Sequence, residues 1–249
     1  MTDQIPLLLL PGLMNDARVW DPICQASPSG RPTVVSPTHT ADSVAAMAAA
    51  ALNAIPQGRF AVAGFSLGGY VAIEVCRQAP HRIAGIALLD TGARADSDDA
   101  KQNRQRMVAA LGSGSASLAQ VAGAFASRVV HAAHAQDPEL LALLGDMARN
   151  VGSDGFVRQQ TAAMSRPDGR DVLRTLHCPA LVLCGREDQI TPPALSEEMA
   201  GLLPGDVELV IVPECGHMST LEQPGIVVEA FKRWVARVDG GAVERTIKL

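Results

Sequence analysis

The most informative feature of the sequence is a serine between two glycines, in Gly64-Phe65-Ser66-Leu67-Gly68. An apolar run over 60–63 precedes it and a segment with helical spacing follows, which predicts a strand, a sharp turn and a helix. Such a turn exposes the serine hydroxyl, and residues without side chains on either side let the strand and the helix approach each other. Ser66 is therefore the predicted nucleophile, and its alternative role is that of a helix N-cap.

A serine hydroxyl is a weak nucleophile until a neighbouring base takes its proton, so this chemistry requires a histidine held by a carboxylate. His217 follows a glycine on a loop after the predicted strand 207–212. That loop lies at the carboxyl end of the strand, where parallel sheets bind their ligands. His217 is therefore the predicted base. We interpret the other five histidines as solvated or bonded locally: His39, His81, His131, His134 and His177.

Two carboxylates compete for the third position. Asp188 lies on the loop after the predicted strand 180–184, and the resulting order of serine, acid and histidine is the one expected for a serine in this kind of turn. Asp90 ends the predicted strand 83–89 and would reach the same edge of the sheet. We favour Asp188 and keep Asp90 as the alternative acid, with a turn cap as its other role.

The elements that must position these residues alternate between short apolar runs and segments of helical spacing, which is typical of βα units. The sequence predicts the α/β fold class, with a mainly parallel sheet of about six strands flanked by helices. The predicted strands are 5–10, 33–36, 60–63, 83–89, 180–184 and 207–212. One helix is expected over 44–55, capped by Asp42 or Ser43, and another over 227–238, ended by Gly240-Gly241. The tail 242–249 shows no comparable pattern.

The region 94–171 has no strand signal and is rich in alanine, glutamine and arginine. Glycine, proline and aspartate clusters interrupt it at 112–114, 137–138, 152–155 and 167–169, so three or four helices fit there. Because β-rich runs stand on both sides, we expect a helical cap inserted over 94–171 into an α/β core formed by 1–93 and 172–249.

Composition narrows the class of partner. The 21 basic and 26 acidic residues give a formal net charge of −5, which disfavours binding of nucleic acid. No apolar run approaches the ~18 residues of a membrane helix, and the first one lacks the flanks of a signal peptide, so we expect no membrane association and a cytoplasmic location. The five cysteines contain no C-x-x-C pair, and we interpret them as buried, reduced thiols. No metal and no cofactor are expected.

Four segments together resemble the α/β-hydrolase fold in order and spacing: 7–13, with Pro11-Gly12 at the end of the first strand, the serine turn, the loop 185–192 and the pair Gly216-His217. The resemblance covers essentially the whole chain. It implies an oxyanion hole formed by the backbone N–H groups of Leu67 and Leu13. Because Pro11-Gly12 stands where many members have His-Gly, Met14 remains the alternative to Leu13.

A serine nucleophile disfavours the family branches that use aspartate at this position to displace halide or open epoxides. The resemblance therefore implies hydrolysis of a carboxylic ester, thioester or lactone of a small molecule through an acyl-enzyme on Ser66. The stretch 164–170 resembles the small bacterial esterase and lactonase branch that includes 3-oxoadipate enol-lactonases. A slow or non-catalytic small-ligand receptor and a cofactor-free lyase or acyltransferase remain alternatives. The oligomeric state is not determined by the sequence.

Overall fold

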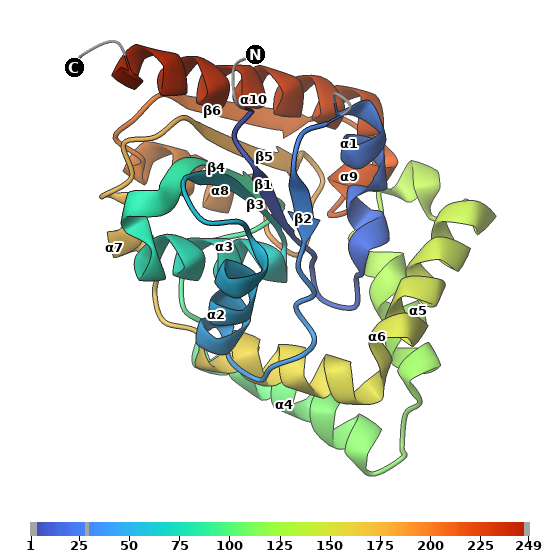
Figure 1. Cartoon of the computed structure of the whole chain (residues 1–249). Coiled ribbons are helices and arrows are strands. Elements are labelled where there is room, and N and C mark those ends of the chain that lie inside the picture. The colour runs from blue at the N-terminus through green and yellow to red at the C-terminus, as the bar shows by residue number, and fades with distance from the viewer. Residues whose placement is uncertain (1–3, 28–29, 247–249) are drawn as a thin grey trace.

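The computed structural model describes residues 4–27 and 30–246, and a six-stranded sheet runs through its centre (Figure 1). All neighbouring strands are parallel, in the order β2-β1-β3-β4-β5-β6. The strands are β1 (Leu7–Leu10), β2 (Thr33–Val35), β3 (Phe60–Phe65), β4 (Ile83–Leu89), β5 (Ala180–Gly185) and β6 (Val207–Val212). The predicted fold class is confirmed, and the observed strand ends differ from the predicted ones by no more than two residues.

Helices cover both faces of the sheet. The α-helices are α1 (Asp21–Ala26), α2 (Val44–Ala54), α3 (Leu67–Gln78), α4 (Asp98–Gly112), α5 (Leu118–Val129), α6 (Pro138–Ser165), α7 (Arg170–Leu173), α8 (Pro193–Leu202), α9 (Ser219–Glu222) and α10 (Pro224–Thr246). Three short 3-10 helices are η1 (Ala17–Trp20), η2 (Pro80–Arg82) and η3 (Ala132–His134). Ser43 caps α2, since its side chain accepts a hydrogen bond from Ala46 N. This settles the choice between Asp42 and Ser43.

Two buried apolar layers hold the sheet, because successive side chains of a strand point to opposite faces. Leu8 and Leu10 of β1 belong to the layer shared with α2, α3 and α8. Leu7 and Leu9 belong to the layer shared with α1 and α10, where Trp20 and Trp234 are fully buried. Strands buried on both faces account for the continuously apolar sequence of β1, β3, β4 and β5.

The strand order reverses direction at β1. From β1 the chain passes to β2 on one side, and it returns to β3 on the other side of β1. Connections that diverge in this way leave a crevice at the carboxyl ends of the two strands. The loop after β1 and the serine turn after β3 therefore meet at one point of the sheet edge.

Between β4 and β5 the described chain contains helices and no strand. Figure 1 shows α4, α5 and α6 as a separate group on the side of the molecule away from α10. Helix α6 is kinked at Gly152, which has a positive φ of 72° within an otherwise helical run. The predicted interruption at 152–155 is thus observed at Gly152, where the backbone leaves the helical conformation between two helical segments. The division into a core and a cap stays a prediction.

Two sequence expectations are wrong. The Gly240-Gly241 pair does not end the last helix, because α10 continues to Thr246. Glycine lowers helix stability but keeps its backbone N–H, so it does not block the helix as proline does. Of the predicted tail, residues 247–249 lie outside the described residues. Cys24 is exposed and Cys178 is half-buried, so the predicted burial holds only for the other three cysteines.

Candidate active site

The serine turn has the conformation that the glycine spacing predicts. Ser66 lies between β3 and α3 with φ 53° and ψ −117°, in a backbone region that residues other than glycine rarely occupy. A Cβ atom on Gly64 would overlap the carbonyl oxygen of Gly68, and one on Gly68 would overlap that of Leu10. The two glycines therefore let α3 approach β3 and β1, and the strained serine lies between them.

A continuous line of hydrogen bonds runs from Ser66 to Asp188. The Ser66 Oγ atom lies 2.8 Å from His217 Nε2, and His217 Nδ1 lies 2.7 Å from Asp188 Oδ2. The loop after β5 fixes the carboxylate, because Asp188 accepts bonds from the backbone N–H groups of Ile190 and Thr191 and from the Thr191 hydroxyl, at 2.8, 3.0 and 2.7 Å. The structure thus brings together the three residues that the sequence singled out.

Close backbone contacts explain the glycines at the ends of the acid and histidine loops, since a Cβ atom on Gly216, before His217, would crowd the main chain of 129–131. A Cβ atom on Gly185, at the end of β5, would overlap the carbonyl oxygen of Gly216. The loop carrying the acid and the loop carrying the histidine therefore touch through their main chains. On its other side, the N–H of His217 donates to Val129 O at 2.6 Å, which ties the histidine loop to the end of α5.

The electrostatics of the pair favour an ionised acid and a basic imidazole. Burial by itself would raise the pKa of Asp188, but the charge and hydrogen bond of His217, with the bonds from Thr191, bring that pKa below its usual value. Burial opposes protonation of His217, but the Asp188 carboxylate outweighs it and raises the pKa of the imidazole above its usual value. The two groups stabilise each other's charge.

Asp90 is close to this pair but does not bond to the histidine. It is fully buried, with one carboxylate oxygen accepting from Gly185 N at 3.0 Å and the other bound to the Ser219 hydroxyl by a short hydrogen bond. Burial, and then the negative charge of Asp188, hold its pKa well above the usual range. The geometry therefore favours Asp188 as the partner of His217 and gives Asp90 a place between β4, β5 and α9.

Glu222 is a site residue that the sequence analysis did not identify. Its fully buried carboxylate accepts from the N–H groups of Gly216 and Met218, on either side of the histidine, at 3.0 and 3.1 Å. Its other oxygen accepts from His131 N at 2.6 Å and lies 2.9 Å from His134 Nδ1. No motif marks this role, since it depends on the turn that brings α9 back under the histidine loop. The ring of His131 is bonded locally, as expected, since its Nδ1 accepts from Ala133 N, whereas His134 is bonded to Glu222, far away in the sequence.

Two backbone N–H groups near Ser66 are available to a ligand. Leu67 is the first residue of α3, so its N–H has no acceptor within the helix. In the loop after β1, Met14 N donates to the side chain of Gln159 at 3.0 Å, whereas no hydrogen bond within 4–27 and 30–246 uses Leu13 N. Leu13, and not Met14, therefore has the free donor.

A small apolar cavity of about 20 Å³ adjoins this loop. It is lined by Leu13, Met14, Asn15, Ala122, Phe125, Ala126, Val129, Leu144, Ala148 and Met218. The walls thus come from the loop after β1, from α5 and α6, and from the residue that follows the histidine. A group bound there would meet side chains without charge.

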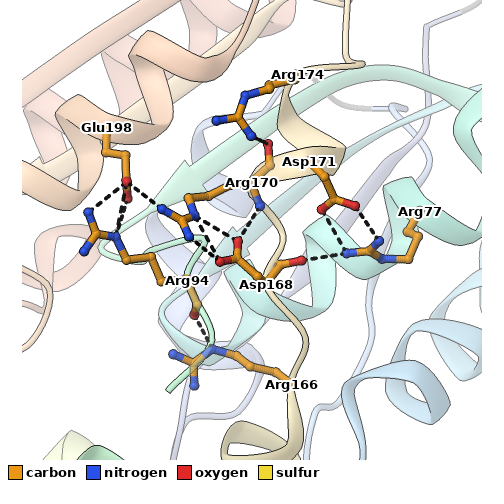
Figure 2. A network of polar contacts seen from close by, with 8 residues as sticks. All are labelled: Arg77, Arg94, Arg166, Asp168, Arg170, Asp171, Arg174 and Glu198. Atoms are coloured by element: carbon orange, nitrogen blue, oxygen red, sulfur yellow. Dashed lines mark hydrogen bonds and ion pairs between the residues drawn. The ribbon is translucent and has the colours of Figure 1, made fainter. Parts of the chain in front are cut away.

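The stretch 164–170 makes structural contacts with neighbouring helices (Figure 2). Arg77 of α3 pairs with Asp171 at 3.1 Å and donates to Asp168 O, while Arg170 binds Asp168 at 2.6 Å. Arg166 stacks over the ring of Tyr70, 3.9 Å from its centre. Among the bonds drawn in this network, none reaches the three residues of the hydrogen-bonded line. The stretch anchors the end of α6 beside α3.

In the part of the chain that the structure describes, no cluster of histidine, cysteine, aspartate or glutamate could hold a metal ion. The same residues contain no helix long and apolar enough to cross a membrane.

Comparisons with known proteins bear on the family and the fold of the chain. A family model for the alpha/beta hydrolase fold matches residues 5–224. A pimeloyl-[acyl-carrier protein] methyl ester esterase from Nitrosomonas europaea is 28% identical over 238 residues, covering 90% of this chain and 93% of that protein. One of the same description from Neisseria meningitidis serogroup A is 25% identical over 71% of this chain, which spans only 57% of that protein's length.

Solved structures show the same fold. A thermophilic esterase from Thermogutta terrifontis superposes with a TM-score of 0.84 and 29% identity, covering 94% of this chain and 90% of that one. An enol-lactonase from Burkholderia xenovorans LB400 superposes with a TM-score of 0.80 and 20% identity, covering 93% and 92%.

Proposed function

The chain belongs to the α/β-hydrolase fold family, and we propose that it hydrolyses a carboxylic ester, thioester or lactone of a small molecule through an acyl-enzyme on Ser66. The observation that carries the proposal is the line of hydrogen bonds from Asp188 through His217 to Ser66. The esterases among its relatives and structural neighbours support the reaction class.

In the proposed reaction, Ser66 Oγ attacks the substrate carbonyl carbon while His217 Nε2 takes the hydroxyl proton. The Asp188 carboxylate orients the imidazole and stabilises its positive charge. His217 then gives the proton to the leaving oxygen or sulfur as the acyl-enzyme forms. The alcohol or thiol departs from an ester or thioester, whereas the hydroxyl of an opened lactone stays attached to the acyl group. A water molecule repeats the sequence on the acyl group, with His217 again as base, and releases the carboxylic acid and free Ser66.

The negative charge of the tetrahedral intermediate would be held by the N–H groups of Leu67 and Leu13. This assignment is supported because neither N–H donates to another group in the described residues, whereas Met14 N donates to Gln159. Removing one donor of this kind costs ~10²- to 10³-fold in kcat in other enzymes. Because both are main-chain groups, substitutions at 13 and 67 would change the shape of the site but not delete the donors.

The small cavity beside Leu13 favours a substrate with a small acyl or alcohol group. Its volume of about 20 Å³ is close to the room that one water molecule requires, ~10–15 Å³. A long chain would require the lining side chains to move. We therefore expect a higher kcat/KM for p-nitrophenyl acetate than for p-nitrophenyl octanoate.

The test uses a fluorophosphonate probe and p-nitrophenyl acetate or butyrate, with Ser66→Ala as the control. A single adduct mapped by mass spectrometry to Ser66, and turnover lost in Ser66→Ala, are expected. A small-ligand receptor would show neither burst nor turnover, with ligand binding unaffected by the substitution. A lyase or acyltransferase would be revealed by products that do not incorporate water. The cap role of 94–171 and the cytoplasmic location stay predictions.

A further inference from the structure

One buried side chain of α6 is bonded to the loop after β1. Gln159 has no exposed surface, and its Oε1 accepts from Met14 N at 3.0 Å. Its Nε2 donates to Gly12 O and to the Thr38 hydroxyl, both at 3.2 Å. The Thr38 hydroxyl in turn donates to Pro11 O at 3.0 Å. Gln159 thus holds the peptide groups on both sides of Leu13, from a helix more than 140 residues away in the sequence.

The loop needs such support because its backbone is not relaxed. Met14 has a positive φ of 57°, which a methionine rarely adopts. A strained conformation persists only where surrounding contacts fix it. The bonds to Gly12 and Met14 are internal to the protein, so they form without a ligand.

We propose that Gln159 is a positioning residue for oxyanion stabilisation: it fixes the loop so that Leu13 N, and not Met14 N, donates to the reacting carbonyl oxygen. The inference rests on the proposed hydrolase function. Gln159 itself does not touch the substrate in this account. Its amide suits the role because one group must accept from an N–H while donating to a carbonyl, and an amide offers both.

The helices between β4 and β5 would then both line the apolar cavity and hold the loop after β1. Helix α6 contributes the wall residues Leu144 and Ala148 to the apolar cavity, and Gln159 beyond the Gly152 kink fixes the oxyanion loop. A preorganised donor lowers the barrier only if it is already in place when charge develops on the substrate. Loss of Gln159 should therefore act on the transition state more than on substrate binding.

The test compares Gln159→Met with Gln160→Met. Gln160 is the matched control because it is the next residue of α6, is equally buried, and bonds to Arg104 instead of the loop. With p-nitrophenyl acetate we expect kcat of Gln159→Met to fall ~10- to 100-fold with KM within about threefold, part of the loss known for a missing donor. The inhibition constant of a trifluoromethyl ketone should rise by the factor by which kcat/KM falls. Gln160→Met should keep kcat within about threefold.

A second measurement does not depend on hydrolysis. Amide hydrogen exchange of Met14, followed by NMR, should be at least ~10-fold faster in Gln159→Met than in the wild type or in Gln160→Met, because the acceptor of that N–H is gone. If Gln159→Met does not fold, Thr38→Val removes one partner of the amide without altering α6, and we expect a smaller fall in kcat in the same direction.

Unchanged exchange at Met14 in Gln159→Met would overturn the proposal. So would an equal loss of kcat in Gln160→Met, since the effect would then reflect general damage to α6. If the wild type shows no hydrolysis that is lost in Ser66→Ala, the proposed function is overturned instead. The hydrogen exchange of Met14 would then decide by itself whether Gln159 holds the loop.

Discussion

Two regions of the molecule contain a carboxylate paired with a basic side chain at a similar distance but in opposite surroundings. In the hydrogen-bonded line, His217 and Asp188 are 2.7 Å apart and their side chains are 1% and 0% exposed. In the network beside α7 (Figure 2), Arg77 and Asp171 are 3.1 Å apart but 34% and 67% exposed. Exposure to solvent, rather than distance, decides what such a pair can do.

The physical reason is the dielectric environment. Water screens the exposed pair, and its formation costs side-chain entropy, so such bridges contribute ~0–1 kcal/mol. Burial strengthens the interaction between His217 and Asp188 and makes the loss of either partner costly, because the other charge is left without compensation. The same neighbours that shift the pKa of His217 also aim its Nε2 at Ser66.

The largest effect is expected from breaking the buried pair at the acid. Asp188→Asn should lower kcat by ~10³- to 10⁴-fold, because the imidazole loses the group that selects its tautomer and stabilises its charge. The carboxylate now raises the pKa of His217, and turnover requires the neutral imidazole. In the wild type kcat/KM should therefore rise with pH through a value above the usual 6.5. In Asp188→Asn the residual activity should begin to rise at lower pH. The pH dependence of kcat/KM, measured for the wild type and for Asp188→Asn, checks both expectations. The assignment of Asp188 would be contradicted if activity rose over the same pH range in the two proteins.

Glu222 is a third case: its buried carboxylate accepts from backbone N–H groups and contacts His134, which lies outside the line from Asp188 to Ser66. Glu222→Gln replaces one carboxylate oxygen by an NH2 group. That group then faces N–H groups which donated to the oxygen in the wild type. We expect a loss of ~2–4 kcal/mol in the free energy of unfolding and a fall of about tenfold in kcat as the His217 loop loosens. Urea unfolding and steady-state kinetics measure the two. The control is Glu187→Gln, an exposed carboxylate with one bond to Cys215 N, which should change neither appreciably.

Asp90 tests whether burial alone makes a carboxylate catalytic. Its pKa is held well above the usual range, so asparagine resembles its protonated form, and the amide can still accept from Gly185 N. Asp90→Asn should lower kcat by less than about tenfold, with some loss of stability. The assignment of the acid would be reversed if Asp90→Asn abolished turnover while Asp188→Asn left it nearly intact.

The smallest effect is expected in the exposed network. Asp171→Asn removes one partner of Arg77, which keeps Glu74 and Asp168 O. The free energy of unfolding should therefore change by less than ~0.5 kcal/mol, and by less still at high salt. Thermal melting at two salt concentrations measures this, and kcat should stay at the wild-type value. A fall in kcat here would mean that the anchoring of the α6 end reaches the active site.

The sequence predicted those parts of the site whose constraint is local. Gly64 and Gly68 are needed within one turn of Ser66, and the acid and histidine loops follow apolar strands that are recognisable one at a time. The contacts of Glu222 and Gln159 were not predicted, because each joins residues that only the folded chain brings together. Helix ends were also uncertain: Gly240-Gly241 has the composition of a stop signal, but α10 passes through it.

Sequence alone determined the chemistry-bearing residue types, their order, and the parallel sheet whose edge collects them, because side-chain period and turn sterics act over a few residues. The tertiary structure decided which carboxylate faces the imidazole and which N–H of the first loop is free. Those choices depend on desolvation and on hydrogen bonds from distant elements, as when Gln159 occupies Met14 N and leaves Leu13 N available.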